Sequence, residues 1–405
     1  MPAPPAIIAR LKALFPPSSH GRIFLVGGMV RDLLLHQPHL DIDLAAALTA
    51  DEFSRLGFSL IQGKSTAPLW FRHDPELGTI EITPLDNCAQ LTADLTRRDF
   101  TVNAMAMALD GMVIDPIAGK RDLDARQLSP CSATVFHDDP LRILRAFRFE
   151  SSGWRLSPET LALLHSKPWE PELRRVPVER CTREMLKALA APAPHVFFQR
   201  MLELQIGSTY LPELHRMPAI PAGPPQHHPE GDLASHSLQV LERTSMLSPY
   251  PLARFCALFH DLGKLATDPA LLPRHHGHDR TGSRMAAPFC ARLRLPAVYG
   301  RALAWVCRYH GMFNQWEELR DSTRIRMAQQ AIRSGIERIL PQVSAADKPG
   351  PALATIEREW TTVLRIAAMT ATELGLNPPA LEGVPPAKRA EVLLQHRIAT
   401  LRTTK

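Results

Sequence analysis

Residues 23–44 read IFLVGGMVRDLLLHQPHLDIDL and place a glycine turn, an arginine and two aspartates within one short segment. The apolar run at 23–26 predicts a buried strand, and the pattern at 30–35 predicts the first turns of a helix. The glycine pair between them lets the backbone come close to a ligand. Exposed amides at the start of that helix, with Arg31 beside them, form an anion site. The segment therefore predicts a strand, a ligand-binding turn and a helix in succession.

Asp41 and Asp43 stand one residue apart in the alternating sequence DIDL. In a strand, this spacing points both carboxylates to the same face. Paired carboxylates attract Mg²⁺, a hard cation that prefers oxygen ligands and substrate phosphates, and two such ions can clamp the oxygens of a nucleotidyl transfer. Glu81 lies in a second alternating stretch, where it is either a third carboxylate near the metals or an ordinary exposed strand residue.

Composition limits the classes of protein to which the chain can belong. With 405 residues and 45% hydrophobic content, it is long enough for two or more domains with buried cores. The net charge of +6 is compatible with a polyanionic partner. Six scattered cysteines without a CxxC pair argue against a zinc ribbon or a disulfide framework and favour reduced, cytoplasmic thiols. No apolar stretch reaches the length of a membrane span, so we expect a cytoplasmic protein without a membrane partner.

Two further motifs are rich in arginine. Residues 95–105 read LTRRDFTVNAM, and residues 137–149 read HDDPLRILRAFRF. In the second motif, aspartate at the cap and proline at the first helical position are typical of a helix start. The arginines that follow recur every third residue and therefore form a stripe along one side of the helix. Taken alone, the first motif could cap a helix and the second could be a solvated basic face.

Together with the segment at 23–44, these motifs resemble those of the class II tRNA nucleotidyltransferase and poly(A) polymerase family. The resemblance implies a nucleotidyltransferase head in which Asp41 and Asp43 are catalytic and bind Mg²⁺. It also implies that Asp99 and Asn103 orient the ribose or fix the loop. The residues that it implies in nucleotide binding are Gly28, Arg31, Arg98, Asp139, Arg142, Arg145 and Arg148.

In that family, an aspartate and an arginine of the third motif serve as an amino-acid template that pairs with the base of CTP or ATP. By resemblance, these residues are Asp139 and Arg142. The role is chemically reasonable, because a carboxylate accepts hydrogen bonds from an exocyclic amine and an arginine donates to ring or carbonyl acceptors. Arg145 and Arg148 would then contact the triphosphate or the base.

The second half of the chain is rich in histidine, with HHPEGDLASH at 227–236, FHDLGK at 259–264, RHHGH at 274–278 and YH at 309–310. An adjacent His-Asp with another histidine one helix upstream resembles the ligand layout of HD phosphohydrolases. Imidazole and carboxylate ligands suit transition metals such as Ni²⁺ or Mn²⁺ and leave positions open for water and phosphate. The metal ligands that the resemblance implies are His236, His260, Asp261 and, later in the chain, Asp347. His275, His276 and His278 are candidates for further ligands or phosphate contacts.

We therefore expect an α+β fold. The predicted parts are an N-terminal extension (1–20), a nucleotidyltransferase head with a small mixed β-sheet (21–136), an all-α neck and body (137–222), an α-helical HD domain (223–350) and a helical tail (351–405). The proline-rich stretch at 218–229 has little periodicity and predicts a linker. The oligomeric state is open between monomer and homodimer.

The function that the resemblance implies is addition of CCA to the 3′ end of tRNA from CTP and ATP, without a nucleic-acid template. The HD domain would add phosphatase, 2′-nucleotidase and 2′,3′-cyclic phosphodiesterase activity. Family members that add the full CCA carry a flexible basic loop before the RRD motif, whereas residues 81–97 here are short and lack it. Three alternatives stay open: a CC-adding enzyme, an HD phosphohydrolase with an RNA-binding head, and a poly(A) polymerase.

Overall fold

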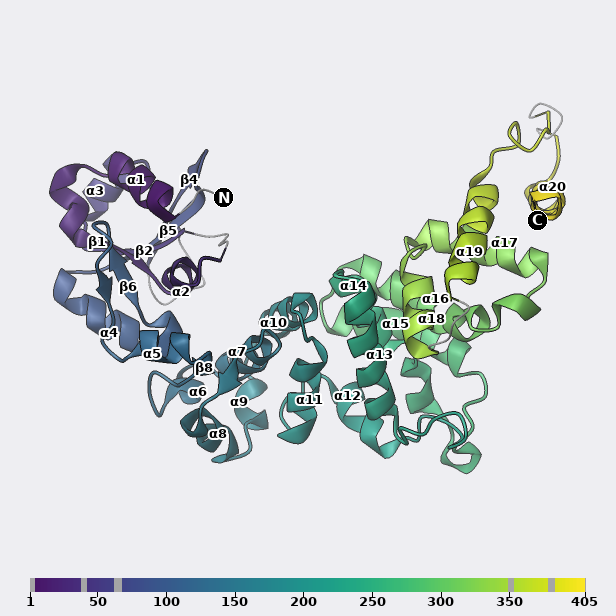
Figure 1. Cartoon of the computed structure of the whole chain (residues 1–405), viewed down its shortest axis with the longest axis horizontal. Helices are drawn as coiled ribbons and strands as arrows, with labels where there is room; N and C mark the ends of the chain where they lie inside the picture. Colours follow the sequence, from purple (N-terminus) through teal and green to yellow (C-terminus); the bar gives the residue numbers. More distant parts are fainter. Residues whose placement is uncertain (1–3, 38–41, 62–67, 349–352, 378–382, 405) are drawn as a thin grey trace. The chain divides into compact units, whose positions relative to one another are not determined.

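The computed structural model of the chain describes residues 4–37, 42–61, 68–348, 353–377 and 383–404 (Figure 1). The chain divides into two compact units, at 1–169 and 170–405. The first unit holds a mixed β-sheet and the second is helical, which confirms the predicted α+β class. None of the described helices is long and apolar enough to cross a membrane. All six cysteines are free, and four of them are buried.

The first unit is organised around a seven-stranded sheet with the order β3-β4-β5-β2-β1-β6-β7. Strands β2 and β5 pair in parallel, and the other neighbours are antiparallel. The first strand has the predicted bounds, and the predicted strand at Asp41 is described from residue 42, so that Asp41 lies outside the described residues. The strands are β1 (Ile23–Val26), β2 (Ile42–Ala46), β3 (Ser59–Ile61), β4 (Leu69–Asp74), β5 (Gly78–Pro84), β6 (Ala106–Ala108) and β7 (Val113–Ile114).

One face of this sheet carries the core that supports the motifs. Phe24 of β1 and Ala45 of β2 are paired across the sheet and belong to one buried cluster. Leu91 and Leu95 of helix α4 (Leu91–Thr96) complete that cluster. Because side chains alternate along a strand, Asp43 lies on the same face of β2 as Ala45. The sheet therefore holds Asp43 at the edge of a packed core, where it is half-buried.

Short helices join the strands of the first unit and follow them. The helix predicted at 30–35 begins two residues earlier, at Gly28, and the helix of the third motif begins after Pro140. A two-stranded pairing of β8 (Gln127–Leu128) with β9 (Arg155–Leu156) was not predicted, because two-residue strands carry no periodicity. The helices are α1 (Pro4–Leu14), η1 (Pro17–Arg22), α2 (Gly28–Leu34), α3 (Ala50–Arg55), η2 (Cys88–Gln90), α4, η3 (Thr101–Asn103), α5 (Gly119–Asp124), α6 (Val135–Asp138), α7 (Leu141–Glu150) and α8 (Pro158–His165).

The second unit is helical throughout its described residues (Figure 1). Helices α13, α14, α16 and α18 pack against one another, and α15 packs along α16. Phe255, Phe259 and Phe289 form the aromatic core between α14 and α15. The helices are α9 (Glu170–Leu173), α10 (Val178–Ala190), α11 (His195–Glu203), α12 (Pro212–Arg216), η4 (Met217–Ala219), α13 (Leu233–Leu247), α14 (Pro251–Phe259), η5 (Leu262–Ala266), η6 (Pro269–Leu271), α15 (His278–Arg292), α16 (Ala297–Phe313), η7 (Trp316–Glu318), α17 (Asp321–Ser334), α18 (Ile339–Asp347), α19 (Leu353–Ala368) and α20 (Pro386–Thr404).

The proline-rich stretch at 218–229 is part of the folded second unit, so its prediction as a linker was wrong. The carbonyl of Pro221 accepts a hydrogen bond from His275, and the carbonyl of Ala222 accepts one from Lys264 at 2.6 Å. A proline-rich sequence shows neither helix nor strand periodicity, so this packing could not be predicted from it. The segment is fixed instead by side chains that reach its carbonyl groups from elsewhere in the unit.

Candidate active sites

Asp43 and Glu81 lie side by side in the sheet of the first unit. The parallel register of β2 and β5 pairs Asp43 directly with Glu81. Paired residues of neighbouring strands point to the same face, so the two carboxylates project together. Both side chains are half-buried. The arrangement provides oxygen ligands of the kind that Mg²⁺ prefers, and it favours Glu81 as the third carboxylate over an ordinary strand residue.

The glycine turn after β1 brings the backbone close to the second motif. Gly27 has φ +71°, and a Cβ atom there would lie 2.4 Å from Nη1 of Arg98. The Arg98 guanidinium therefore lies directly over the turn, and its Nη2 donates to Asp94 at 3.0 Å. Only glycine combines this backbone conformation with this close approach. The turn thus fixes a cation beside the start of α2, which contains Gly28 and Arg31.

A chain of hydrogen bonds joins α2, the second motif and α7. Arg31 donates from Nη1 to the Asn103 side-chain oxygen at 2.6 Å and from Nε to Asp32 at 2.9 Å. Asn103 in turn donates to Asp99 at 2.9 Å, and Arg145 donates from Nε to the other Asp99 oxygen at 2.9 Å. Of the two roles that the resemblance allowed for Asp99 and Asn103, this geometry favours fixing the loop.

Asp99 is charged although it is buried. Burial alone would raise its pKa, but the charge of Arg145, with hydrogen bonds from Asn103 and from the Phe100 amide, outweighs burial and lowers it. A carboxylate with three such partners is strongly held. Asp99 is therefore the fixed centre of this chain of hydrogen bonds, because Arg145 binds it directly and Arg31 is joined to it through Asn103.

The three arginines of the third motif lie along α7 as their spacing predicted, and all three are half-buried. Arg142 donates to the carbonyls of Val135 at 3.2 Å and Arg97 at 2.8 Å, so it is attached to the second motif. Arg148 stacks its guanidinium on the Phe149 ring, 4.2 Å from its centre. Asp139 accepts from the amide of Leu141 at 3.2 Å in the first turn.

The second unit contains a compact cluster of histidine and aspartate side chains. His236 of α13 approaches Asp347, at the end of α18, to 3.1 Å and the Nε2 atom of His260 to 3.3 Å. His260 lies 3.2 Å from Oδ2 of Asp261. All four ligands that the resemblance implied therefore meet, although they come from three separate segments of the chain.

Two further histidines reach the other oxygen of Asp261. Nε2 of His278 lies 3.3 Å from Oδ1, and Nε2 of His310 lies 3.4 Å from it. Oδ1 is buried and has no hydrogen-bond partner within the described residues, which is the geometry of a carboxylate oxygen that faces a metal ion. His278 was among the candidates from the sequence, and the role of His310 was missed.

Each of the four rings has its Nδ1 atom occupied by an oxygen, and its Nε2 atom faces the cluster. The Nδ1 partners are the carbonyls of Ala257, His275 and Val306 for His260, His278 and His310, and the Glu230 carboxylate for His236. Such partners fix the tautomer and the orientation of metal-binding imidazoles. The donor set fits one or two transition-metal ions.

The electrostatics of the cluster favour bound positive charge. Burial alone would lower the pKa of His260, but the charges of Asp261 and Asp347 outweigh it and raise the pKa to about 10. Burial likewise opposes ionisation of Asp261, but Lys264, at 2.6 Å, and His260 hold its pKa well below the usual range. Hydrogen bonds from His236 and His260 likewise outweigh burial and lower the pKa of the half-buried Asp347, so both carboxylates stay charged at neutral pH and attract a cation.

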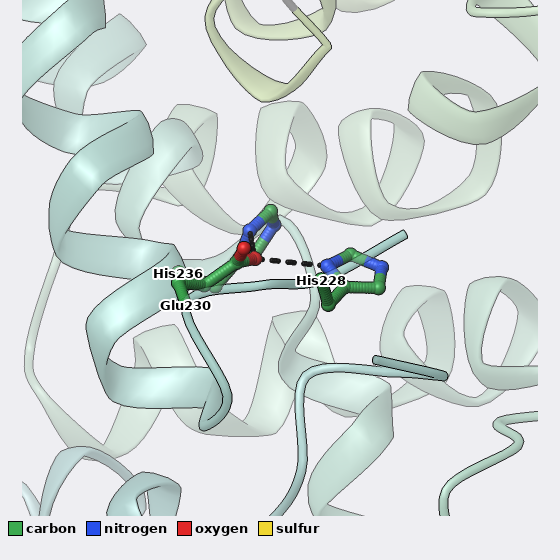
Figure 2. Close-up of side chains that lie close together, drawn as sticks. All are labelled: His228, Glu230 and His236. Carbon is green, nitrogen blue, oxygen red and sulfur yellow. Dashed lines mark hydrogen bonds and ion pairs between the residues drawn. The ribbon is translucent and has the colours of Figure 1, made fainter. Parts of the chain in front are cut away.

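The remaining histidines differ in their contacts. His275 bonds to Pro221 and to the Thr267 hydroxyl, which is a structural role, and His276 is exposed. Figure 2 shows the Glu230 carboxylate between the rings of His228 and His236, at 2.9 and 2.7 Å from their Nδ1 atoms. The sequence singled out the string with His228 and Glu230, but gave no sign of this shared contact.

Comparison with protein families identifies the class to which this architecture belongs. Residues 71–129 match the poly A polymerase head domain, residues 153–217 match the probable RNA and SrmB-binding site of polymerase A, and residues 233–339 match the HD domain. The chain is thus a nucleotidyltransferase of the poly(A) polymerase head class that also carries an HD domain.

The relatives define its family. The chain is 35% identical to the multifunctional CCA protein of Methylococcus capsulatus, over 94% of each chain. It is 36% identical to that of Teredinibacter turnerae, over 75% of this chain and 78% of the relative. The chain belongs to the family of multifunctional CCA proteins.

Solved structures agree with this family assignment. The CCA-adding enzyme of Bacillus stearothermophilus in complex with CTP superposes with a TM-score of 0.69 at 25% identity, covering 99% of this chain and 93% of the other. The Thermotoga maritima CCA-adding enzyme complexed with tRNA shares the fold, with a TM-score of 0.64 at 21% identity and coverage of 98% and 92%.

Proposed function

We propose that the chain adds CCA to the 3′ end of tRNA, using CTP, ATP and Mg²⁺ without a nucleic-acid template. The observation that carries the proposal is the direct pairing of Asp43 with Glu81 on the sheet that also positions the Gly27 turn. Asp41 and Asp43 would bind Mg²⁺, which would supply positive charge to activate the tRNA 3′-hydroxyl and to neutralise the triphosphate. Gly28, Arg31 and Arg98 would hold the phosphates.

Base selection would fall to Asp139 and Arg142 on the first turn of α7. The hydrogen bond from Arg142 to the Arg97 carbonyl ties the selecting residue to the motif that contacts the nucleotide. Arg145 and Arg148 would supply positive charge along the same helix. A carboxylate and a guanidinium can present acceptors and donors to the base edges of both CTP and ATP.

The test is incorporation of labelled CTP and ATP into tRNA that lacks CCA. The joint substitution Asp41→Ala with Asp43→Ala should abolish incorporation while leaving the melting temperature of the protein close to that of the wild type. Retained incorporation would contradict the proposal. Long ladders of A on unstructured RNA would instead indicate a poly(A) polymerase, and no incorporation by the wild type would favour an HD hydrolase with an RNA-binding head.

A second candidate, an enzyme that adds only CC, is favoured by one observation. After β5 ends at Pro84, η2 begins at Cys88 and runs into α4, so only residues 85–87 lie between regular elements. This segment leaves little room for the mobile loop that drives the change from CTP to ATP in the family. Sequencing the 3′ ends made with both nucleotides decides between them: CCA ends support our proposal, and products that stop at CC reject it.

The proposal extends to the HD domain, which would hydrolyse phosphate esters as a phosphatase, 2′-nucleotidase and 2′,3′-cyclic phosphodiesterase. His236, His260, Asp261 and Asp347 would hold one transition-metal ion, and Asp261, His278 and His310 would hold a second. Bound ions would activate water and polarise the phosphate. Asp261 would then bridge the two positions through its two oxygens, and Lys264 would fix its orientation.

The HD activity is tested with adenosine 2′,3′-cyclic phosphate, with and without added Ni²⁺ or Mn²⁺. His260→Ala and Asp261→Ala should each abolish hydrolysis. His276→Ala is the matched control, because His276 is exposed and stands outside the cluster. Hydrolysis that persists in the first two variants would show that the metal site lies elsewhere.

A further inference from the structure

Phe71 of β4 is an exposed aromatic residue on the same face of the first unit's sheet as Asp43 and Glu81. The register of β4 and β5 pairs Phe71 with Glu81, and the register of β5 and β2 pairs Glu81 with Asp43. Paired residues of neighbouring strands point to one face, so the three side chains form a row across the sheet. Two strand spacings, about 10 Å, separate the ends of this row.

Phe71 differs from the other aromatic residue of its strand. Trp70 points to the opposite face, where it is buried and stacks on Phe53 of α3. Phe71 keeps 38% of its surface exposed. A ring that the core of the sheet does not cover presents a flat apolar surface to a ligand. This surface stands directly beside Glu81, the proposed third carboxylate.

The order of the strands separates Phe71 from the proposed phosphate-binding residues. Asp43 lies on β2, between β5 and β1. The Gly27 turn follows β1 and carries Arg98 over it, whereas Phe71 lies two strands from Asp43 in the other direction (Figure 1). In a phosphoryl or nucleotidyl transfer, the attacking and leaving oxygens lie roughly in line, on opposite sides of the phosphorus. With the triphosphate on the β1 side, the acceptor hydroxyl would come from the side of Phe71.

We propose that Phe71 stacks on the base of the 3′-terminal nucleotide of the acceptor tRNA and so positions its 3′-hydroxyl beside Asp43 and Glu81. Stacking on aromatic side chains is a general way in which proteins hold unpaired RNA bases. It tolerates every base, because each base has a π-face. This tolerance fits an acceptor whose last base changes as nucleotides are added. The inference rests on the proposed tRNA nucleotidyl transfer and assigns a residue that binds its acceptor.

The test measures the KM for tRNA lacking CCA and the KM for CTP separately, with the full chain. Phe71→Ala should raise the KM for tRNA about tenfold, within the range for one stacked base, and leave the KM for CTP within about twofold. Phe71→Trp should keep the KM for tRNA low, since indole is also a flat ring. Leu60→Ala is the matched control, because Leu60 is 40% exposed but is paired with Trp70 and so belongs to the opposite face. An unchanged KM for tRNA in Phe71→Ala, or an equal rise in Leu60→Ala, would overturn the proposal.

A substrate without the base tests the contact itself. For the wild type, tRNA whose 3′-terminal nucleotide is abasic should have a KM about tenfold higher than that of ordinary tRNA lacking CCA. For Phe71→Ala the two tRNAs should have the same KM, because one partner of the contact is already absent. A difference that persists undiminished in Phe71→Ala would show that the base is held by another residue.

The same variant tests whether the contact is independent of the base. Stacking predicts a similar rise in KM for tRNAs that end before CCA, after one added C and after CC. A rise confined to one of these three ends would indicate recognition of a particular base and would contradict stacking.

A binding measurement keeps the inference independent of the chemical step. Without CTP or ATP, the wild type should bind ordinary tRNA lacking CCA about tenfold more tightly than the abasic form, and Phe71→Ala should bind both alike. Equal binding of the two tRNAs by the wild type would overturn the role of Phe71. A wild type that shows this preference through Phe71 but incorporates neither CTP nor ATP would contradict the proposed nucleotidyl transfer alone.

Discussion

Asp43 on β2 and Glu81 on β5 are paired residue to residue in the parallel pair of strands of the head sheet. The pairing brings together two carboxylates that are 38 positions apart in the sequence, through backbone register alone. Because β1 lies on the other side of β2 and runs antiparallel to it, the Gly27 turn after β1 lies at the start of β2, near Asp43. The head site is therefore a consequence of strand order.

This pairing predicts a graded response to loss of charge. Asp43→Asn should lower nucleotide incorporation roughly a thousandfold, because it removes a proposed metal ligand worth several kcal/mol. Glu81→Gln should lower it less, by about tenfold, and should raise the Mg²⁺ concentration needed for half-maximal activity. Steady-state incorporation across a Mg²⁺ titration measures both. An unchanged Mg²⁺ requirement in Glu81→Gln would show that Glu81 is an ordinary strand residue and not a third metal-binding carboxylate.

The Gly27 turn predicts a specific effect on nucleotide binding. Gly27→Ala places a methyl group on Nη1 of Arg98 and should raise the KM for CTP and ATP about tenfold or more. Gly111→Ala is the matched control, since Gly111 also has a positive φ, +95°, but has no atom near the added carbon. Both changes cost about 1–3 kcal/mol of backbone strain. The two variants should therefore melt alike, and a similar KM in both would contradict the role of Arg98.

The elements of the head that carry the proposed site could be predicted from the sequence because their motifs are local. The strand at 23–26, the glycine turn and the arginine stripe of α7 each depend on neighbours a few residues apart, where periodicity and turn chemistry are informative. The link from Arg31 through Asn103 and Asp99 to Arg145 could not be predicted in the same way. It joins three segments whose relative placement depends on packing.

The histidine cluster shows the same limit in the second unit. The adjacent pair His260 and Asp261 is conspicuous in the sequence, and Asp347, which was expected as the closing ligand, lies 3.1 Å from His236. His310 lies on a largely apolar helix, where a histidine in the sequence resembles any buried polar residue. Only the packing of α16 against α14, which Asp261 follows in the chain, shows that the Nε2 atom of His310 reaches Asp261.

The buried Asp99 predicts a pH dependence of stability. Its folded pKa is lowered, so its pairing stabilises the fold fully above the unfolded value of about 3.9 and the contribution is lost as pH falls from there toward the folded pKa. Asp99→Asn should lower the free energy of unfolding by about 2 kcal/mol at pH 7. The loss is not larger because Arg145 is partly exposed and its charge is screened by solvent. Melting temperatures of both proteins should differ by a constant amount from pH 7 to about 5 and converge below about 4. A difference that persists unchanged at pH 3 would contradict this account.

The two-oxygen contact of Asp261 predicts the number of bound metal ions. Asp261 Oδ1 faces His278 and His310, whereas Oδ2 faces His236 and His260. The wild type loaded with Mn²⁺ should therefore bind two ions in the HD domain.

His310→Ala should bind one ion fewer, because it loses one of the three ligands of the second position. His276→Ala should keep both ions, since this exposed histidine stands outside the cluster. Metal analysis after gel filtration measures the stoichiometry, and Asp43→Asn can serve as the background to reduce binding by the head. If the wild type binds a single ion in the HD domain and His310→Ala binds the same number, the second position does not exist. The ligands would then be His236, His260, Asp261 and Asp347.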